Sequence, residues 1–203
     1  MALNRRGFLI GVGGVAACAA PFAGGRMASP EVSPSGGAAV APPGSGGFDR
    51  LKRLCTGCNL CVARCPTKVL KAAKGEYGLE GVMMPVMDFG AGFCDPDCTR
   101  CGEACPTGAI LPLVRSAKRT VRIGLAAVDH AKCLSASGRE SCGLCSRHCP
   151  YGALVLKKAD KRERPVVDPA KCVGCGACAH VCPVTAIGIR PVGQDQVVSS
   201  NEG

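Results

Sequence analysis

The chain has 203 residues, a formal net charge of +10, and an aromatic content of 3% with no tryptophan. So few large side chains exclude a fold that depends mainly on an extensive apolar core. Seventeen cysteines approach the density at which cross-links or metals hold a chain together. The scarce aromatic residues also argue against nucleic-acid binding, in spite of the positive charge.

Residues 1–28 are predicted to be a twin-arginine export signal. Arg5 and Arg6 precede a Phe-Leu pair and a weakly apolar run rich in glycine and alanine that continues to Ala23. An ordinary secretion signal or a short membrane anchor is the alternative. The run is shorter than the roughly 20 apolar residues that span a bilayer. No other stretch is long enough, so we expect no transmembrane span in the mature chain.

Cys18 follows small residues that resemble a bacterial lipobox. It either becomes the lipidated first residue of a membrane-tethered lipoprotein or is removed with the signal, and in neither case is it a cluster ligand. Residues 29–47 are rich in Pro, Gly and Ser and are predicted to be a flexible linker. The predicted folded domain covers residues 48–192, and the polar residues 193–203 are expected to form a flexible tail.

The predicted domain contains one cysteine motif four times. The first cysteines of the units stand at positions 55, 94, 133 and 172, a constant step of 39 residues. Every unit ends in C-x2-C-x3-C-P, and only the first gap varies: it has two residues in units one and four, three in unit two and eight in unit three. The first and fourth units have the spacing of bacterial ferredoxins. The sixteen candidate iron ligands are Cys55, Cys58, Cys61, Cys65, Cys94, Cys98, Cys101, Cys105, Cys133, Cys142, Cys145, Cys149, Cys172, Cys175, Cys178 and Cys182.

This spacing suits four [4Fe–4S] clusters. The first three cysteines of a unit wrap the backbone around one cube, and the fourth ligates the other cluster of a pair, while the proline turns the chain away. Glycines in the loops permit tight turns and bring backbone N–H groups near sulfur, although simple turn formation explains them equally well. The alternatives are eight disulfides, zinc sites, or one loop that holds a three-iron cluster or none. The repeated third cysteine and proline favour the cubanes.

The segments between the loops predict an α+β fold of two bacterial-ferredoxin-like dicluster modules, with short β-hairpins and helical turns around the clusters. Short apolar strands are expected after each proline, and further strands lead into the loops. A helical turn is expected at each C-x3-C-P. The predicted strands lie at residues 69–70, 85–88, 108–111, 127–132, 152–156, 165–171 and 186–189. Two basic runs, 115–122 and 157–164, are predicted at hairpin tips, either as docking sites for an acidic partner or membrane surface or as solvated turns.

We find no catalytic constellation, dinucleotide fingerprint or flavin motif. His130, His148 and His180 each lie within three residues of a candidate ligand and are predicted to be surface residues, with a potential-tuning role as the alternative. The chain is therefore expected to carry electrons and not to act as an enzyme.

The signal and the four motifs together resemble the NapG/MauM family of periplasmic ferredoxin-type proteins and, more distantly, the iron–sulfur subunits of molybdopterin oxidoreductases. The resemblance implies a periplasmic relay between a membrane quinol-oxidising iron–sulfur protein and a periplasmic reductase or cytochrome. A fixed iron–sulfur subunit of a molybdopterin-type complex and an assembly factor are the alternatives. Clusters are inserted in the cytoplasm, which agrees with export of the folded protein by the twin-arginine route.

Cluster pairing has two solutions. Sequential pairing, unit one with two and unit three with four, follows from chain proximity. The resemblance to oxidoreductase subunits implies nesting, with units one and four around units two and three, and we adopt nesting as the expectation.

Overall fold

The computed structural model describes residues 39–159 and 162–192, so the predicted signal, Cys18 and the C-terminal tail lie outside the described residues. The helices are α1 (Phe48–Leu54), α2 (Leu60–Arg64), the 3-10 helix η1 (Leu79–Gly81), α3 (Arg100–Glu103), α4 (Arg115–Lys118), α5 (Leu134–Ser137), α6 (Leu144–Arg147) and α7 (Ala177–His180). The strands are β1 (Leu70–Ala72), β2 (Pro85–Met87), β3 (Gly124–Val128), β4 (Leu154–Ala159), β5 (Arg162–Val167) and β6 (Ile187–Pro191). No helix in these ranges has the length and hydropathy needed to cross a membrane.

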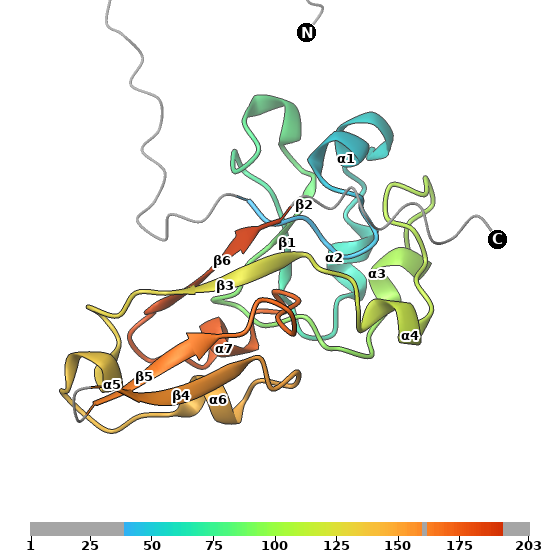
Figure 1. Cartoon of the computed structure of the whole chain (residues 1–203). Helices are drawn as coiled ribbons and strands as arrows, with labels where there is room; N and C mark the ends of the chain where they lie inside the picture. Colours follow the sequence, from blue (N-terminus) through green and yellow to red (C-terminus); the bar gives the residue numbers. More distant parts are fainter. Residues whose placement is uncertain (1–38, 160–161, 193–203) are drawn as a thin grey trace, which may run out of the picture. The chain divides into compact units, whose positions relative to one another are not determined.

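The strands form three antiparallel pairs. β1 pairs with β2 and β4 pairs with β5 as hairpins, with Leu70 opposite Met87 and Leu154 opposite Val167. β3 pairs with β6, which follows it after about 60 residues of chain, and Val128 lies opposite Ile187. Figure 1 shows β3 and β6 running side by side, with the β4–β5 hairpin nearby. This long-range pair closes the C-terminal half of the fold around two cysteine loops.

A helix of four or five residues lies at each C-x3-C-P, as the sequence predicts. α2, α3, α6 and α7 each contain the third cysteine of a unit and end just before the fourth. Helices this short are not stable in isolation, because nucleation costs more than one turn of hydrogen bonds returns. Their cysteines and their tertiary contacts must therefore hold them.

The core is built largely from thiols and small apolar side chains. Leu51, Ile110 and Ile123 are among its largest fully buried residues. Six cysteines belong to the same buried cluster: Cys61, Cys65, Cys94, Cys172, Cys175 and Cys178. The interior that aromatic residues fill in other domains is lined here by candidate metal ligands.

The expected linker is wrong over its last residues. Val40, Pro42 and Ser45 are buried, and the carbonyl of Val40 accepts a hydrogen bond of 2.9 Å from the N–H of Met87 in β2. The carbonyl of Gly44 likewise accepts one of 2.9 Å from Leu111. Pairing with backbone from two other segments overrides the flexible composition, so the packed region includes residues 40–47 and does not begin at Phe48.

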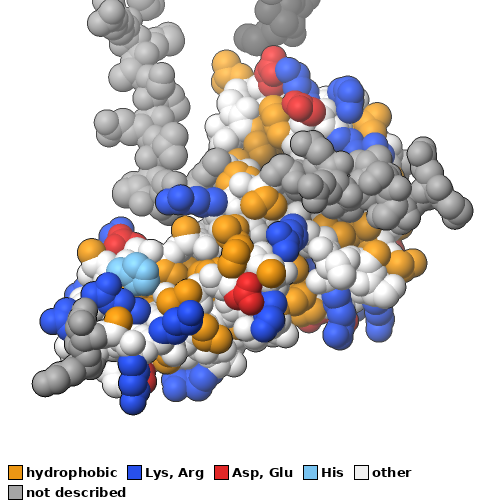
Figure 2. All heavy atoms as spheres, viewed as in Figure 1, with side chains coloured by type: hydrophobic (Ala, Val, Ile, Leu, Met, Phe, Trp, Pro, Cys, Tyr) orange, Lys and Arg blue, Asp and Glu red, His pale blue; other side chains and the backbone are white. Residues whose placement is uncertain are grey.

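Two further sequence expectations are corrected. Residues 108–111 form no strand, because the N–H of Ile110 donates to the sulfur of Cys105 and that of Leu111 to Gly44. The basic run 115–122 begins with α4 and is not a hairpin tip. The described residues of the run 157–164 lie at the paired ends of β4 and β5, and residues 160–161 between them lie outside the described residues. Basic side chains gather at that end of the molecule in Figure 2, over α5, β4 and β5.

Candidate metal centres

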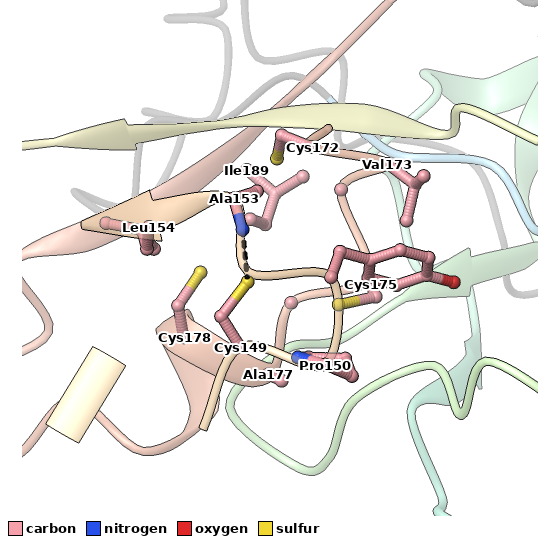
Figure 3. Close-up of a pocket in the computed structure, with 13 residues that line it drawn as sticks. Cys149, Pro150, Ala153, Leu154, Cys172, Val173, Cys175, Ala177, Cys178 and Ile189 are labelled. Carbon is pink, nitrogen blue, oxygen red and sulfur yellow. Dashed lines mark hydrogen bonds between the residues drawn. The ribbon is translucent and has the colours of Figure 1, made fainter. Parts of the chain in front are cut away.

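Four cysteines from two different units converge at one pocket. Cys172, Cys175 and Cys178 come from the fourth unit, and Cys149 is the fourth cysteine of the third unit. Figure 3 shows their sulfur atoms around a common space, with Cys178 on α7 and Cys149 just beyond the end of α6. The pocket also receives Tyr151 from the segment after Cys149. A loop with three thiols is thus completed by a thiol from its neighbour.

The first unit shows the same arrangement through its electrostatics. Burial, together with the smaller effects of the charges of Cys55, Cys105 and Cys58, raises the pKa of Cys61 to about 11. Cys105 is the fourth cysteine of the second unit, so it joins the three loop cysteines of the first.

The remaining two groups follow the same rule. Burial raises the pKa of Cys94, and among its cysteine neighbours Cys98 and Cys65 act in the same direction. Burial also raises the pKa of Cys145, and Cys182 of the fourth unit adds to it together with the upstream cysteines of the third unit. We name the groups by their loops: group I is Cys55, Cys58, Cys61 and Cys105; group II is Cys94, Cys98, Cys101 and Cys65; group III is Cys133, Cys142, Cys145 and Cys182; group IV is Cys172, Cys175, Cys178 and Cys149.

The expectation of nested pairing is therefore wrong. Units one and two exchange their fourth cysteines, and units three and four do the same, because α2 packs against α3 and α6 against α7. The short chain between consecutive units favours this exchange, since closing a shorter loop costs less entropy.

Three of the four fourth cysteines accept backbone hydrogen bonds on sulfur. The N–H of Ala153 donates to Cys149 at 3.3 Å, as drawn in Figure 3, and the N–H of Ala186 donates to Cys182 at 3.2 Å. In the second unit the N–H of Ile110 donates to Cys105 at 3.4 Å. In the first unit the Thr67 hydroxyl lies 3.6 Å from the sulfur of Cys65. Such bonds favour the thiolate, the form that binds iron.

A left-handed residue, which sequence analysis missed, directs these amides. The residue three positions after each fourth cysteine has a positive φ: Lys68 (57°), Gly108 (67°), Gly152 (58°) and Thr185 (48°). In units three and four the turn brings the next backbone amide back over the sulfur, and in unit two the amide two residues on reaches it. Glycine at this position in units two and three was the available signal, because glycine adopts a positive φ without strain.

The residues fit a [4Fe–4S] cluster in each group. All sixteen described cysteines are free of disulfides. No three His, Cys, Asp or Glu side chains of the described ranges are placed to hold a single metal ion, whereas in a cubane each cysteine binds a different iron. The hydroxyl of Tyr151 is buried beside the group IV pocket and has no hydrogen-bond partner within the described part, which leaves a buried polar atom for a bound group to satisfy. The three histidines are exposed, as predicted.

The N-terminal and C-terminal halves meet at two cysteines. The N–H of Cys94 donates to the carbonyl of Cys175 at 2.8 Å, which joins the backbones of groups II and IV. Gly176 has a φ of 81°, and a side chain there would overlap the ring of Phe89. The aromatic rings of Phe93 and His180 lie 6.0 Å apart across the same junction.

Comparison with known proteins agrees with this site. Residues 139–186 match the 4Fe-4S dicluster domain family, a span that contains the fourth unit and the third unit apart from Cys133. The methylamine utilization ferredoxin-type protein MauM of Methylobacillus flagellatus is 33% identical over 74% of this chain and 67% of its own length. MauM of Methylophilus methylotrophus is 34% identical over 74% of this chain and 69% of its own. The ferredoxin-type protein NapF of Escherichia coli is 30% identical over 73% of this chain and 82% of its own.

These similarities support [4Fe–4S] clusters and a role in electron transfer. The chain belongs to the family of ferredoxin-type iron–sulfur proteins that includes MauM, NapF and NapG.

Proposed function

We propose that this chain is a periplasmic electron carrier in which the sixteen cysteines hold four [4Fe–4S] clusters in two dicluster modules. Groups I and II form the first module and groups III and IV the second. The observation that carries the proposal is the exchange of fourth cysteines between adjacent loops, seen most directly where Cys149 completes the pocket of Cys172, Cys175 and Cys178. Each bound cluster supplies a site that accepts and releases one electron at a time.

The cysteine positions support a single path through the protein. The backbone contact between Cys94 and Cys175 makes groups II and IV neighbours, so the order is I, II, IV, III. Burial supports this order: Cys172, Cys175 and Cys178 of group IV are all buried, whereas Cys58 of group I is exposed. Every cysteine of group III is partly exposed. The two ends of the path therefore lie closer to solvent than its middle.

The chain's own residues have two tasks along this path. Backbone amides donate to sulfur, and the apolar residues around the loops, such as Ile123 and Ile189, keep water from the inner groups. The exposed side chains of Lys157, Lys158 and Arg162 on the β4–β5 hairpin supply positive charge at the group III end. They suit an acidic reductase or cytochrome as the partner there, because complementary charge speeds encounter at low salt.

We further propose that residues 1–28 direct export of the folded protein by the twin-arginine route, that Cys18 is either removed or lipidated, and that the folded domain extends to about residue 192. The donor is a membrane quinol-oxidising iron–sulfur protein. Support comes from the paired arginines before an apolar run and from cluster motifs that require a folded cargo.

Iron and acid-labile sulfide analysis of the anaerobically purified full chain, with EPR after reduction by dithionite, tests the proposal. We expect about 16 Fe per chain and signals of interacting reduced cubanes. Fewer than about 12 Fe in fully folded protein would contradict four clusters. The same protein expressed with both signal arginines replaced by lysine should stay in the cytoplasm with its clusters intact. Unchanged export of that variant would refute the twin-arginine route.

A further inference from the structure

α4 contains a lysine that is almost completely buried. Lys118 is only 4% exposed, whereas its neighbours Arg115 and Arg119 are exposed. A buried lysine needs a compensating charge or hydrogen bonds, because removing an ammonium group from water is costly. The sequence offers one signal for its position: it lies three residues before the buried Val121, a spacing that puts both on one side of a helical turn.

Lys118 forms no ion pair within 4.0 Å in the described ranges. Its charge helps to lower the pKa of Asp97, but Arg119 has the larger effect. The nearby Asp97 is occupied by Arg119, whose guanidinium donates to both carboxylate oxygens at 2.8 and 2.9 Å. The Nζ of Lys118 donates instead to the backbone carbonyl of Asp95 at 3.4 Å. This carbonyl belongs to the residue after Cys94, so the ammonium group lies against the group II loop.

The charge of Lys118 faces the thiols of group II. Burial raises the pKa of Cys94, and the ammonium of Lys118 is the main opposing influence. Lys118 acts in the same direction on Cys101. Among the described residues, Lys118 is the only charged residue that is buried. Group II is thus distinguished by a buried positive charge.

We propose that Lys118 is the internal counter-charge of group II and selectively raises the reduction potential of the cluster held there. The inference rests on the proposed function, since it requires group II to bind a [4Fe–4S] cluster. Reduction adds one electron from an external one-electron donor, and the site becomes more negative by one unit. A fixed positive charge nearby stabilises the reduced state more than the oxidised state. Lys118 therefore favours an electron on the group II cluster, which lies at the junction between the two modules because group II adjoins group IV there.

Redox titration of the full chain, followed by EPR, tests this assignment. Lys118→Met removes the charge and keeps a long apolar side chain. We expect one transition to shift to lower potential by at least 59 mV, which corresponds to a tenfold change in a one-electron equilibrium. The equilibrium constants of the other three redox transitions should change by no more than about twofold, because those clusters are farther from the charge. Lys118→Arg keeps the charge, so the potential of this transition should stay close to that of the parent protein.

Arg115→Met is the matched control, because it removes one positive charge from the same helix at an exposed position where solvent and salt screen it. It should leave all transitions within about twofold of the parent protein. A purely structural role of Lys118 would predict equal behaviour of the methionine and arginine variants, or equal shifts in all transitions, and either result would overturn the proposal.

Iron content separates this proposal from the proposed function. A parent protein without about 16 Fe contradicts the function itself. If Lys118→Met shows four transitions at unchanged potentials, only the role proposed for Lys118 is contradicted, and the proposed function is not. If the methionine variant loses iron, Lys118→Gln takes its place with the same expected tenfold shift. If both neutral variants lose iron while Lys118→Arg keeps it, the need for a charge is supported, and loss of iron from Lys118→Arg as well would refute it.

Discussion

The left-handed turn after each fourth cysteine leads to a quantitative prediction about backbone conformation. Gly152 has a φ of 58°, and a Cβ there would meet no atom within 4 Å. Gly152→Ala therefore changes the backbone energy and creates no steric conflict. A residue with a side chain pays roughly 1–2 kcal/mol in this region, and the lower entropy of the unfolded alanine chain returns about 0.4–1 kcal/mol. The expected net loss is about 1 kcal/mol, or a fall of about 2–4 °C in apparent Tm.

The assay is the rate at which the iron–sulfur absorbance disappears in guanidinium under anaerobic conditions, because unfolding with cluster loss is irreversible and is best compared as a rate. A loss of about 1 kcal/mol corresponds to at most about fivefold faster decay. The equivalent positions Lys68 and Thr185 are exposed and already carry the strain, so Lys68→Gly and Thr185→Gly should slow the decay. Equal rates for Gly152→Ala and the parent, or faster decay of Thr185→Gly, would refute the role assigned to this turn.

Three further predictions concern pairing, the junction between modules and a surface loop. Cys65→Ser should abolish the redox transition that Lys118→Met shifts, because sequential pairing assigns Cys65 to group II. Gly176→Ala should accelerate cluster loss more than tenfold, since the new methyl group collides with the ring of Phe89 and overpacking costs about 1–3 kcal/mol beyond the positive φ. The pKa of Glu76 is held at about 2, because although burial raises it, backbone amides and Lys71 lower it more. Its stabilising effect should be complete above about pH 4.5 and decline toward pH 2, so Glu76→Gln should speed amide exchange of residues 73–84 at pH 6 and have a smaller effect at pH 3.

Each of these predictions has an internal control. Cys182→Ser should leave the Lys118-dependent transition in place, and survival of that transition in Cys65→Ser would instead support nesting. Gly152→Ala shares the positive φ of Gly176 without a steric conflict, so equal effects of the two substitutions would argue against the Phe89 contact. Amide exchange in the β4–β5 hairpin should not respond to Glu76→Gln, and a global response would contradict a local effect.

The local structure could be predicted because it depends on residues within each repeat. The four helical turns, the strands β1, β2 and β6 and the β4–β5 hairpin follow from residues that lie within a few positions of the cysteines. Cysteine spacing fixes where a loop can wrap around a cube, and proline and glycine fix where it turns. The exposed histidines were also predictable from their neighbours along the chain.

Contacts between distant residues were not predictable in this way. Residues 40–47 have the composition of a linker, yet their backbone finds partners at Met87 and Leu111. Residues 108–111 have the pattern of a strand, but no neighbouring strand is available and their N–H groups bond elsewhere.

The sequence by itself determined the cysteine loops, the kind of cofactor they suit and the family, because these depend on spacing within single units. Only the tertiary structure decided which fourth cysteine completes which loop, that Cys94 meets Cys175, and that Lys118 is turned inward among thiols. The physical reason is that all four units share the same C-x2-C-x3-C-P motif, so their local sequences allow several pairings. The packing of α2 on α3 and of α6 on α7, together with the long-range β3–β6 pair, selects one of them.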